Sequence, residues 1–328
     1  MTWRAYRTGF SLILLALLVT AALSVFLGRY PRPGWLLPGR LRADPLAAQL
    51  VWNLRIPRVA AAVLVGAALS ASGLTLQMLF RNPLMEPGFL GVSQGAAFGA
   101  AFSILYLGRS PLAVQASAAA FALLGLWLTY FLAGHLRYGG WILRMVLAGI
   151  AVSALFAAGV GMLKYLADPL TQLPEITFWL LGGLWSTRWQ NFLPILPVSI
   201  IALTVLFLAR WRMNVLSLEE ETAFSLGAAP GRERALLLLA AVGATAAVVS
   251  LAGTVGWVGL IVPHLARRFF GADARHALPA SLLLGGLFVL LCDDLARTIS
   301  AGEVPLGILT SLFGAAAFLV ILTRFGMR

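Results

Sequence analysis

The chain has 328 residues, of which 60% are hydrophobic and only 11% are charged, and its mean hydropathy is +0.91. This balance excludes an ordinary water-soluble domain, because about 20 consecutive apolar residues span a bilayer and the chain contains several such runs. The net charge of +12 does not indicate a nucleic-acid partner, since the basic residues stand singly or in pairs between apolar runs, where arginines set membrane topology.

Apolar segments at regular intervals predict an all-α polytopic membrane protein with about ten transmembrane helices in a single transmembrane domain over residues 1–328. The first segment is longer than the apolar core of a signal peptide and is followed by a poor cleavage site, so we interpret it as a retained span. An even number of spans places both termini on one side, and Arg4 and Arg7 favour the cytoplasmic side. The expected segments are 9–28, 56–80, 90–107, 111–134, 142–166, 190–209, 232–252, 254–270, 277–297 and 305–325.

The stretch between the first and second segments is unusually basic for an external region. Positive charge outside opposes the insertion preference, so we expect it to serve an acidic partner that docks from outside. An alternative for Arg29 and Arg32 is that they extend along the membrane interface and serve no partner. The arginines concerned are Arg29, Arg32, Arg40, Arg42, Arg55 and Arg58.

The second segment, 56–80, is rich in Gly, Ala and Ser, which permit close helix packing, so we expect it at the centre of the bundle. Prolines and an Asn in residues 82–88 break the helix after it, and Gly91, Gly95 and Gly99 predict a packing face on the third segment. After the fifth segment, two prolines together with Asp168 and Glu175 predict a short external helix.

A polar stretch at residues 212–231 interrupts the second half of the chain. Glu219, Glu220 and Glu221 cannot lie in hydrocarbon, where one ionised side chain costs about 2.5–3.5 kcal/mol. One short helix is predicted here, with Ser217 capping its start, Glu220 completing a capping box and Gly227 ending it. Its apolar face would consist of Leu216, Leu218, Ala223 and Leu226. We interpret the stretch as a cytoplasmic helix offered to a soluble partner; the alternative is a solvated loop.

Two adjacent carboxylates, Asp293 and Asp294, lie near the outer end of the ninth segment. Arg297 follows Asp293 by four residues on the same helical face and is expected to pair with it. Carboxylates inside a membrane also fit a proton-coupled secondary transporter, which is the rival function of a different class. A membrane-embedded enzyme is disfavoured because the three histidines lie far apart, and the single Cys292 excludes an internal disulfide.

Four motifs from about residue 50 onward resemble the FecCD-like permease family, the membrane subunits of importers for iron-siderophores, haem and cobalamin. They occur in the family's order and at family-like spacing. In this chain they are LRIPRVAAAVLVGAALSASGLTLQMLFRNPLMEPGFLGVSQGAAFGA, LEEETAFSLG, GTVGWVGLIVPHLARR and DDLARTISAGEVPLGILTSLFGAAAFL.

The resemblance implies a type II ABC importer permease fold with ten spans and both termini cytoplasmic. It further implies that two copies of the chain pair, that two ATP-binding cassette subunits lie beneath them, and that an extracytoplasmic substrate-binding protein docks outside. ATP and Mg would bind the partner subunits, because this chain has no G-x-x-x-x-G-K motif and is expected to bind no cofactor or metal itself.

The resemblance also assigns roles to residues of this chain. Arg55, Arg58 and Arg297 match external arginines that pair with glutamates of the binding protein. The segment containing Leu216, Ser217, Leu218, Glu219, Glu220, Glu221, Ala223, Leu226 and Gly227 matches the coupling helix that fits a groove on the ATPase. The translocation path and its inner gate would include Tyr138, Ile142, Leu143, Leu147, Ser153 and Val160, although family members often carry small polar residues where this chain has Ile142 and Leu143.

These implications predict a non-enzymatic, multi-pass permease of the inner (cytoplasmic) membrane, embedded in lipid and without a nucleic-acid partner. It would move a bulky metal chelate by alternating access, with an iron-siderophore as the commonest cargo of the family. Cobalamin, haem and molybdate are the alternatives within the family.

Overall fold

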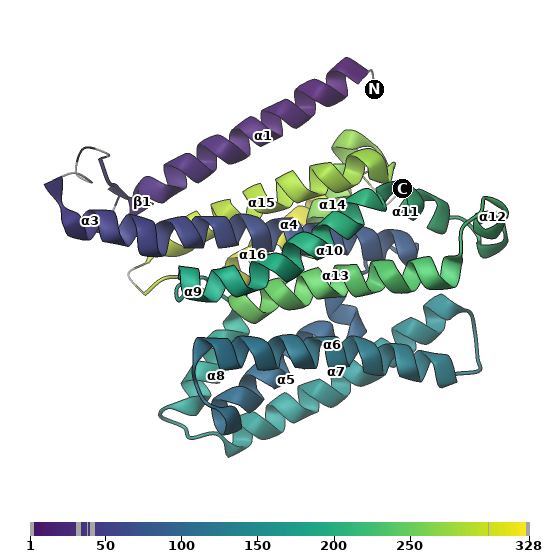
Figure 1. The fold of residues 1–328 in the computed structure, drawn as a ribbon, viewed down its shortest axis with the longest axis horizontal. Helices are drawn as coiled ribbons and strands as arrows, with labels where there is room; N and C mark the ends of the chain where they lie inside the picture. Colours follow the sequence, from purple (N-terminus) through teal and green to yellow (C-terminus); the bar gives the residue numbers. More distant parts are fainter. Residues whose placement is uncertain (1–2, 31–33, 38, 40–42, 301, 326–328) are drawn as a thin grey trace.

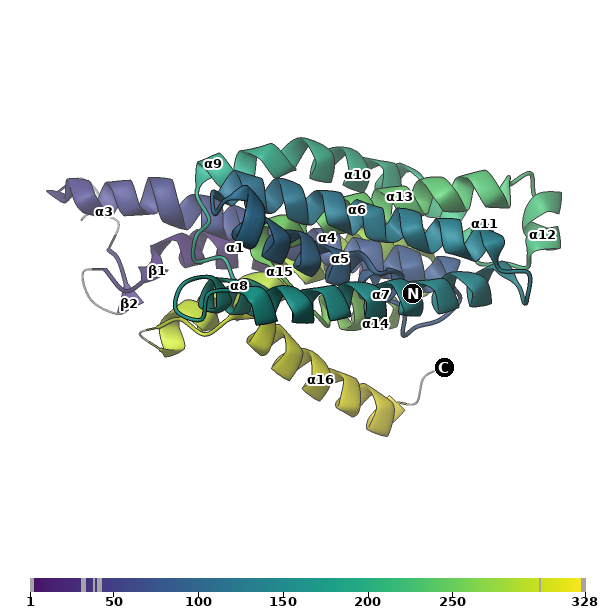
Figure 2. The same cartoon turned by 90° about the horizontal axis from the view of Figure 1, so that it is seen from below.

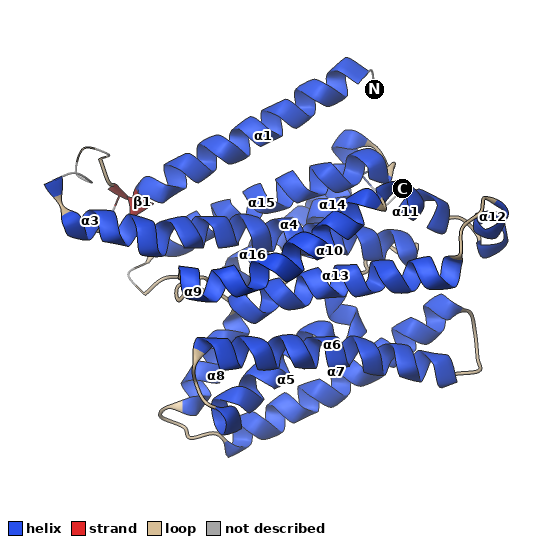
Figure 3. Cartoon of the chain, viewed as in Figure 1, coloured by secondary structure: helices blue, strands red, loops and turns tan. Residues whose placement is uncertain are grey.

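The computed structural model of the chain describes residues 3–30, 34–37, 39, 43–300 and 302–325. Almost all of this length is helical (Figure 3). The sheet found among the described residues is one short antiparallel pair, β1 (Leu27–Gly28) with β2 (Gly34–Trp35). The helices of the first half are α1 (Trp3–Phe26), α3 (Pro45–Leu50), η1 (Val51–Arg55), α4 (Ile56–Leu79), η2 (Pro87–Leu90), α5 (Val92–Phe102), η3 (Ser103–Leu107), α6 (Pro111–His135) and α7 (Trp141–Leu166).

The second half continues with one short helix, α8, before the chain returns through the bundle in the run Trp189–Leu208, which α9, η4 and α10 form together. The short helix expected after the fifth segment is confirmed as α8. The elements are α8 (Gln172–Leu181), α9 (Trp189–Phe192), η4 (Leu193–Ile195), α10 (Leu196–Leu208), α11 (Arg210–Leu216), α12 (Glu220–Ser225), α13 (Pro230–Ala252), α14 (Val258–Phe270), α15 (Ala274–Ile299) and α16 (Leu306–Phe325).

Helix α4 lies at the centre of the bundle, as its small residues predict, and packs against α13, α14 and α15 (Figure 1). The contacts are close because glycines face each other. A Cβ atom built at Gly66 would overlap the carbonyl oxygen of Gly285 in α15, and one built at Gly73 would overlap that of Gly259 in α14. Lipid tails are as apolar as the side chains, so helices in a membrane gain stability chiefly through such close backbone approach.

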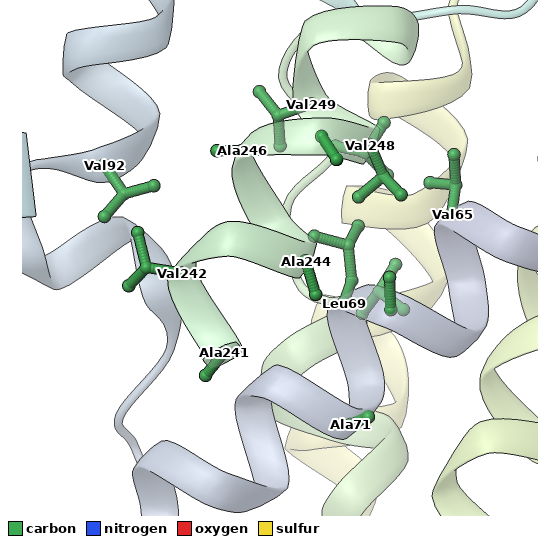
Figure 4. Close-up of a cluster of buried hydrophobic side chains, with 14 of the residues drawn as sticks. Val65, Leu69, Ala71, Val92, Ala241, Val242, Ala244, Ala246, Val248 and Val249 are labelled. Atoms are coloured by element: carbon green, nitrogen blue, oxygen red, sulfur yellow. The ribbon is translucent and has the colours of Figure 1, made fainter. Parts of the chain in front are cut away.

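Helices α5, α6 and α7 form a second group beside this centre, and α13 joins the two (Figure 1). In Figure 4, Val242 of α13 points towards Val92 of α5, while Ala244 and Val248 face Leu69 and Val65 of α4. All five valine and leucine side chains are almost completely buried. The packing face predicted on α5 is present, since Cβ atoms built at Gly95 and Gly99 would overlap carbonyl oxygens of α6.

Each of the ten predicted segments contains helix, but only eight of the helices described are long and apolar enough to span a membrane alone. The continuous run Val92–Leu107 is shorter, and α14 begins only at Val258 rather than at 254. The late start has a local cause, because Gly253 and Trp257 both have positive φ angles, which a helix cannot accommodate.

Both chain ends lie at the same end of the molecule, as an even number of spans predicts. The start of α1 and the end of α16 lie at the end that carries α12, whereas α3, β1 and α9 lie at the opposite end (Figures 1 and 2). Figure 2 also shows α16 leaning away from the rest of the bundle. The two ends are called here the α12 end and the α3 end.

Candidate functional site

The polar stretch at the α12 end folds into two short helices and not into the single helix expected. Ser217 ends α11, and its hydroxyl donates to the carbonyl of Asn214, so it does not cap α12. Glu219 takes the N-cap position of α12 without a side-chain hydrogen bond. Gly227 ends the segment as predicted, with a φ of 78° that favours glycine. The predicted N-cap is absent because the Ser217 hydroxyl is hydrogen-bonded to α11, the preceding helix.

Some apolar residues of this segment are buried against the bundle, and others are exposed. Leu216 and Ala223 are completely buried, whereas Leu218 and Leu226 are 41% and 55% exposed. Phe224, which the sequence interpretation did not single out, is the most exposed apolar residue of α12 at 73%. An exposed aromatic on a short helix outside the bundle is typical of a protein contact, and its position within LEEETAFSLG was the available signal.

Polar contacts tie the α12 segment to three long helices. Glu220 forms an ion pair of 3.0 Å with Arg234 of α13, and Arg81, which follows α4, donates to the carbonyl of Leu218 at 2.6 Å. The guanidinium of Arg234 also lies 5.2 Å from the ring centre of Trp141, the first residue of α7. The α12 segment therefore contacts α13 directly, contacts the residue two positions after α4, and reaches α7 through Arg234.

At the α3 end, an ion-pair cluster joins α4, α15 and the loop before α16. Arg58 donates from Nε and Nη2 to the carboxylate of Asp293 at 2.9–3.0 Å, and from Nη1 to Glu303 at 3.0 Å. The Asp293 side chain is fully buried, and Arg58 is 11% exposed. Arg297 lies 4.0 Å from Asp293, the pairing that the sequence predicts, and it also pairs with Asp294.

The three predicted docking arginines are buried or nearly buried in the single chain. Arg55 is 9% exposed and donates to the carbonyls of Val25, Phe26 and Tyr30, and Arg297 is 5% exposed and donates to Ser24. Burial requires partners, and the neighbouring backbone and carboxylates supply them. Arg32, Arg40 and Arg42 lie outside the described residues.

A cavity of about 270 Å³ opens beside this cluster and is called here the arginine cavity. Four guanidinium groups and one carboxylate contribute to its lining, namely Arg29, Arg55, Arg58, Arg297 and Glu303. Such a concentration of guanidinium groups with few carboxylates is suited to an incoming carboxylate.

A larger cavity of about 610 Å³, called here the central cavity, lies between η2, α5, α7, α13 and the turn before α14. Ser153 and Val160, both predicted to line the path, lie in its wall. Its lining is mainly apolar, with Glu86 as its carboxylate and no Arg, Lys or His among the described residues that form it. Glu86 accepts a hydrogen bond from the Trp257 backbone, and burial raises the pKa of its carboxyl.

The other expected path residues do not line this cavity in the single chain. Tyr138 is 80% exposed in the turn between α6 and α7, and Leu143 and Leu147 are 42% and 47% exposed on α7. Ile142 is partly buried at the start of α7, one residue after Trp141. Leu143 and Leu147 are therefore part of an outward apolar face of α7.

Comparison with known proteins finds one family over nearly the whole chain. The sequence profile of the FecCD transport family matches residues 13–324. The molybdate import system permease protein MolB of Haemophilus influenzae is 37% identical over 96% of both chains. A probable iron chelatin transport system permease protein of Helicobacter pylori is 40% identical over 84% of this chain and 82% of its own. The haemin transport system permease protein HmuU of Yersinia pestis is 40% identical over 84% of this chain and 83% of its own.

A solved structure described as an inward-facing conformation of a putative metal-chelate type ABC transporter superposes with a TM-score of 0.90 at 34% identity. The match covers 97% of this chain and 100% of that one.

Proposed function

The chain belongs to the FecCD transport family, and we propose that it is the transmembrane permease subunit of an ATP-driven importer that moves a bulky metal chelate into the cytoplasm by alternating access. The α12 end would lie in the cytoplasm and the α3 end outside the inner membrane. The eight helices long enough to span a bilayer support a membrane location. Both chain termini share the α12 end, and the arginines near the start of the chain favour the cytoplasmic side for that end.

The observation that carries the proposal is the α12 segment, which exposes Phe224 and Leu226 while Leu216 and Ala223 anchor it. An exposed apolar pair on a rigidly held helix fits a groove on a soluble subunit. The chain itself lacks a phosphate-binding loop, so ATP hydrolysis would take place on that subunit.

The contacts of α12 supply a route from the ATPase to the translocation path. Glu220 holds Arg234, and Arg234 lies over Trp141 at the start of α7. The same helix carries Ser153 and Val160 in the wall of the central cavity. Movement of α12 would therefore rotate or tilt the helix that lines the path, which is the change that alternating access requires.

The outward apolar face of α7 supports pairing with a second copy of the chain. Leu143, Leu147 and Leu155 are 42%, 47% and 65% exposed. The central cavity opens beside this helix, so a second copy placed against it would enclose a passage wider than one chain can form. A bulky cargo requires such width.

The arginine cavity at the α3 end is proposed as the docking site for an acidic side chain of the binding protein. Arg55, Arg58 and Arg297 would form it, as the family resemblance implies, with Arg29 as a further member. Because these arginines are buried in the single chain, the docking carboxylate would insert into the cavity and not pair at a flat surface.

For the cargo we propose an iron-siderophore or a related metal chelate. The described lining of the central cavity lacks basic residues, which suits a neutral chelate that an apolar wall can pass. Molybdate is the second candidate, because the permease that resembles this chain over 96% of its length imports molybdate. Uptake of labelled ferric siderophore, molybdate, haem and cobalamin, each measured separately, distinguishes the four cargos.

The rival proton-coupled mechanism finds little support in the geometry. Its proposed carriers, Asp293 and Asp294, are paired with Arg58 and Arg297. Their oxygens already accept hydrogen bonds from these arginines, so the geometry assigns both carboxylates to contacts between helices.

The proposal is tested by reconstituting the chain with its ATPase in lipid nanodiscs and adding the binding protein. We expect a stable complex whose ATP hydrolysis rises when the binding protein is added. Purification of this chain in active form without any ATPase would overturn the proposal.

A further inference from the structure

An incoming carboxylate at the α3 end would have to displace Glu303 from Arg58. Arg58 lies between two carboxylates, each of which occupies one edge of its guanidinium group. Asp293 takes the Nε–Nη2 edge at 2.9–3.0 Å. Glu303 lies along the Nη1–Nη2 edge: Nη1 donates to Oε1 at 3.0 Å, and Oε2 lies 3.0 Å from Nη2 without a hydrogen bond.

The two edges differ in their access to solvent. Asp293 is fully buried, so the edge that it holds is closed to any partner from outside. Glu303 is 31% exposed and lines the arginine cavity. A guanidinium group binds a carboxylate best through two parallel hydrogen bonds along one edge, so an incoming carboxylate needs the edge that Glu303 holds.

The backbone around Glu303 is held independently of the contact between its side chain and Arg58. The following residues are anchored independently, because the Val304 amide donates to the Ala296 carbonyl and the Leu306 amide to the Gly182 carbonyl, both at 2.9 Å. The Glu303 side chain can therefore leave Arg58 without displacing α16.

We propose that Glu303 is an intramolecular competitor that occupies Arg58 until the carboxylate of the docking binding protein displaces it. The inference rests on the proposed function, because it assumes that the arginine cavity is the docking site. Glu303 supplies the carboxylate among the four guanidinium groups that line the arginine cavity. Removing its charge makes the cavity more positive, which strengthens attraction for an acidic partner.

The decisive variant is Glu303→Gln in the nanodisc complex with ATPase, with the binding protein as the probe in an affinity measurement. Glutamine has nearly the same shape and lacks the charge, so we expect binding about tenfold tighter, with most of the change in the dissociation rate. If Glu303 instead only orients Arg58, the same variant binds more weakly, and weaker or unchanged binding overturns the proposal.

The matched control is Glu175→Gln in α8. Glu175 is 38% exposed, and its carboxylate lies 3.6 Å from Arg109, outside the arginine cavity. We expect no change in binding for this variant. Tightening equal to that of Glu303→Gln would show a general charge effect and would overturn the competition.

Two further measurements separate this inference from the function on which it rests. Arg58→Gln should weaken docking strongly; docking of native strength in that variant contradicts the docking site itself. Glu303→Ala removes both the carboxylate and the length of the side chain, so it should also tighten docking of the binding protein. Weaker docking of Glu303→Ala contradicts the competition even where Glu303→Gln fails to assemble.

Discussion

Arg58 and Asp293, 235 positions apart in the sequence, form a multiply hydrogen-bonded ion pair at 2.9–3.0 Å that joins α4 to α15. Asp293 is fully buried, so its charge depends on this arginine and on Arg297 for compensation. The pair holds the two helices together at the end where the binding protein is proposed to dock.

Asp293→Asn should destabilise the chain by about 3–5 kcal/mol, because removing one partner leaves a buried guanidinium without its main counter-charge. The measurement is thermal unfolding of the purified chain in detergent. Glu175→Gln, which breaks the exposed pair with Arg109, should change stability by less than about 1 kcal/mol. Equal effects of the two variants would contradict a structural role for the Arg58–Asp293 pair.

Phe224→Ala should weaken binding of the ATPase by about 2 kcal/mol or more, which is roughly 30-fold, because an exposed aromatic at the centre of a contact contributes most of its energy. The affinity is measured with the permease in nanodiscs and the free ATPase. Ile201→Ala on α10, a residue 65% exposed on a long apolar helix, is the control and should bind normally. Normal binding by Phe224→Ala would remove α12 from the interface.

Ser153→Trp should block transport, because the added ring would fill part of the central cavity. We expect uptake to fall to the level seen without ATP, while the binding protein still stimulates ATP hydrolysis. Leu124→Trp on α6 introduces the same indole ring at a residue that is 38% exposed and outside the cavity lining, and it should transport normally. Native uptake by the Ser153 variant would show that cargo passes elsewhere.

Gly73→Ala should destabilise the bundle by about 1–3 kcal/mol, since a methyl group there overlaps the backbone of Gly259. Gly243→Ala in α13 provides a test at a position where an added Cβ meets no atom within 4 Å. Alanine favours helix over glycine by up to about 1 kcal/mol, so this variant should be neutral or more stable. The stability of both variants is measured by thermal unfolding. An unchanged unfolding temperature for Gly73→Ala would contradict the close packing of α4 on α14.

The helical fold was predictable because it follows from local patterns. Apolar length locates the spans, and the Gly, Ala and Ser content of 56–80 places that segment at the centre, where Gly66 and Gly73 meet neighbouring backbones. The i to i+4 spacing also predicts the approach of Arg297 to Asp293.

The burial and the partners of the arginines were not predictable, because the partners are distant in the sequence. Arg58 meets Asp293 and Glu303 only after α4 and α15 have packed, and Arg55 is satisfied by carbonyls at the end of α1. Ser217 shows the same limit on a smaller scale: its sequence fits a cap for the following helix, but its hydroxyl bonds to Asn214 behind it.

The most direct test of an ATP-driven importer is uptake of a labelled metal chelate into proteoliposomes that contain this chain with its ATPase. The binding protein is added outside and ATP is enclosed within. We predict uptake that requires both and continues when an uncoupler abolishes the proton gradient. Uptake that proceeds without ATP and stops with the uncoupler would contradict the account and establish proton-driven transport.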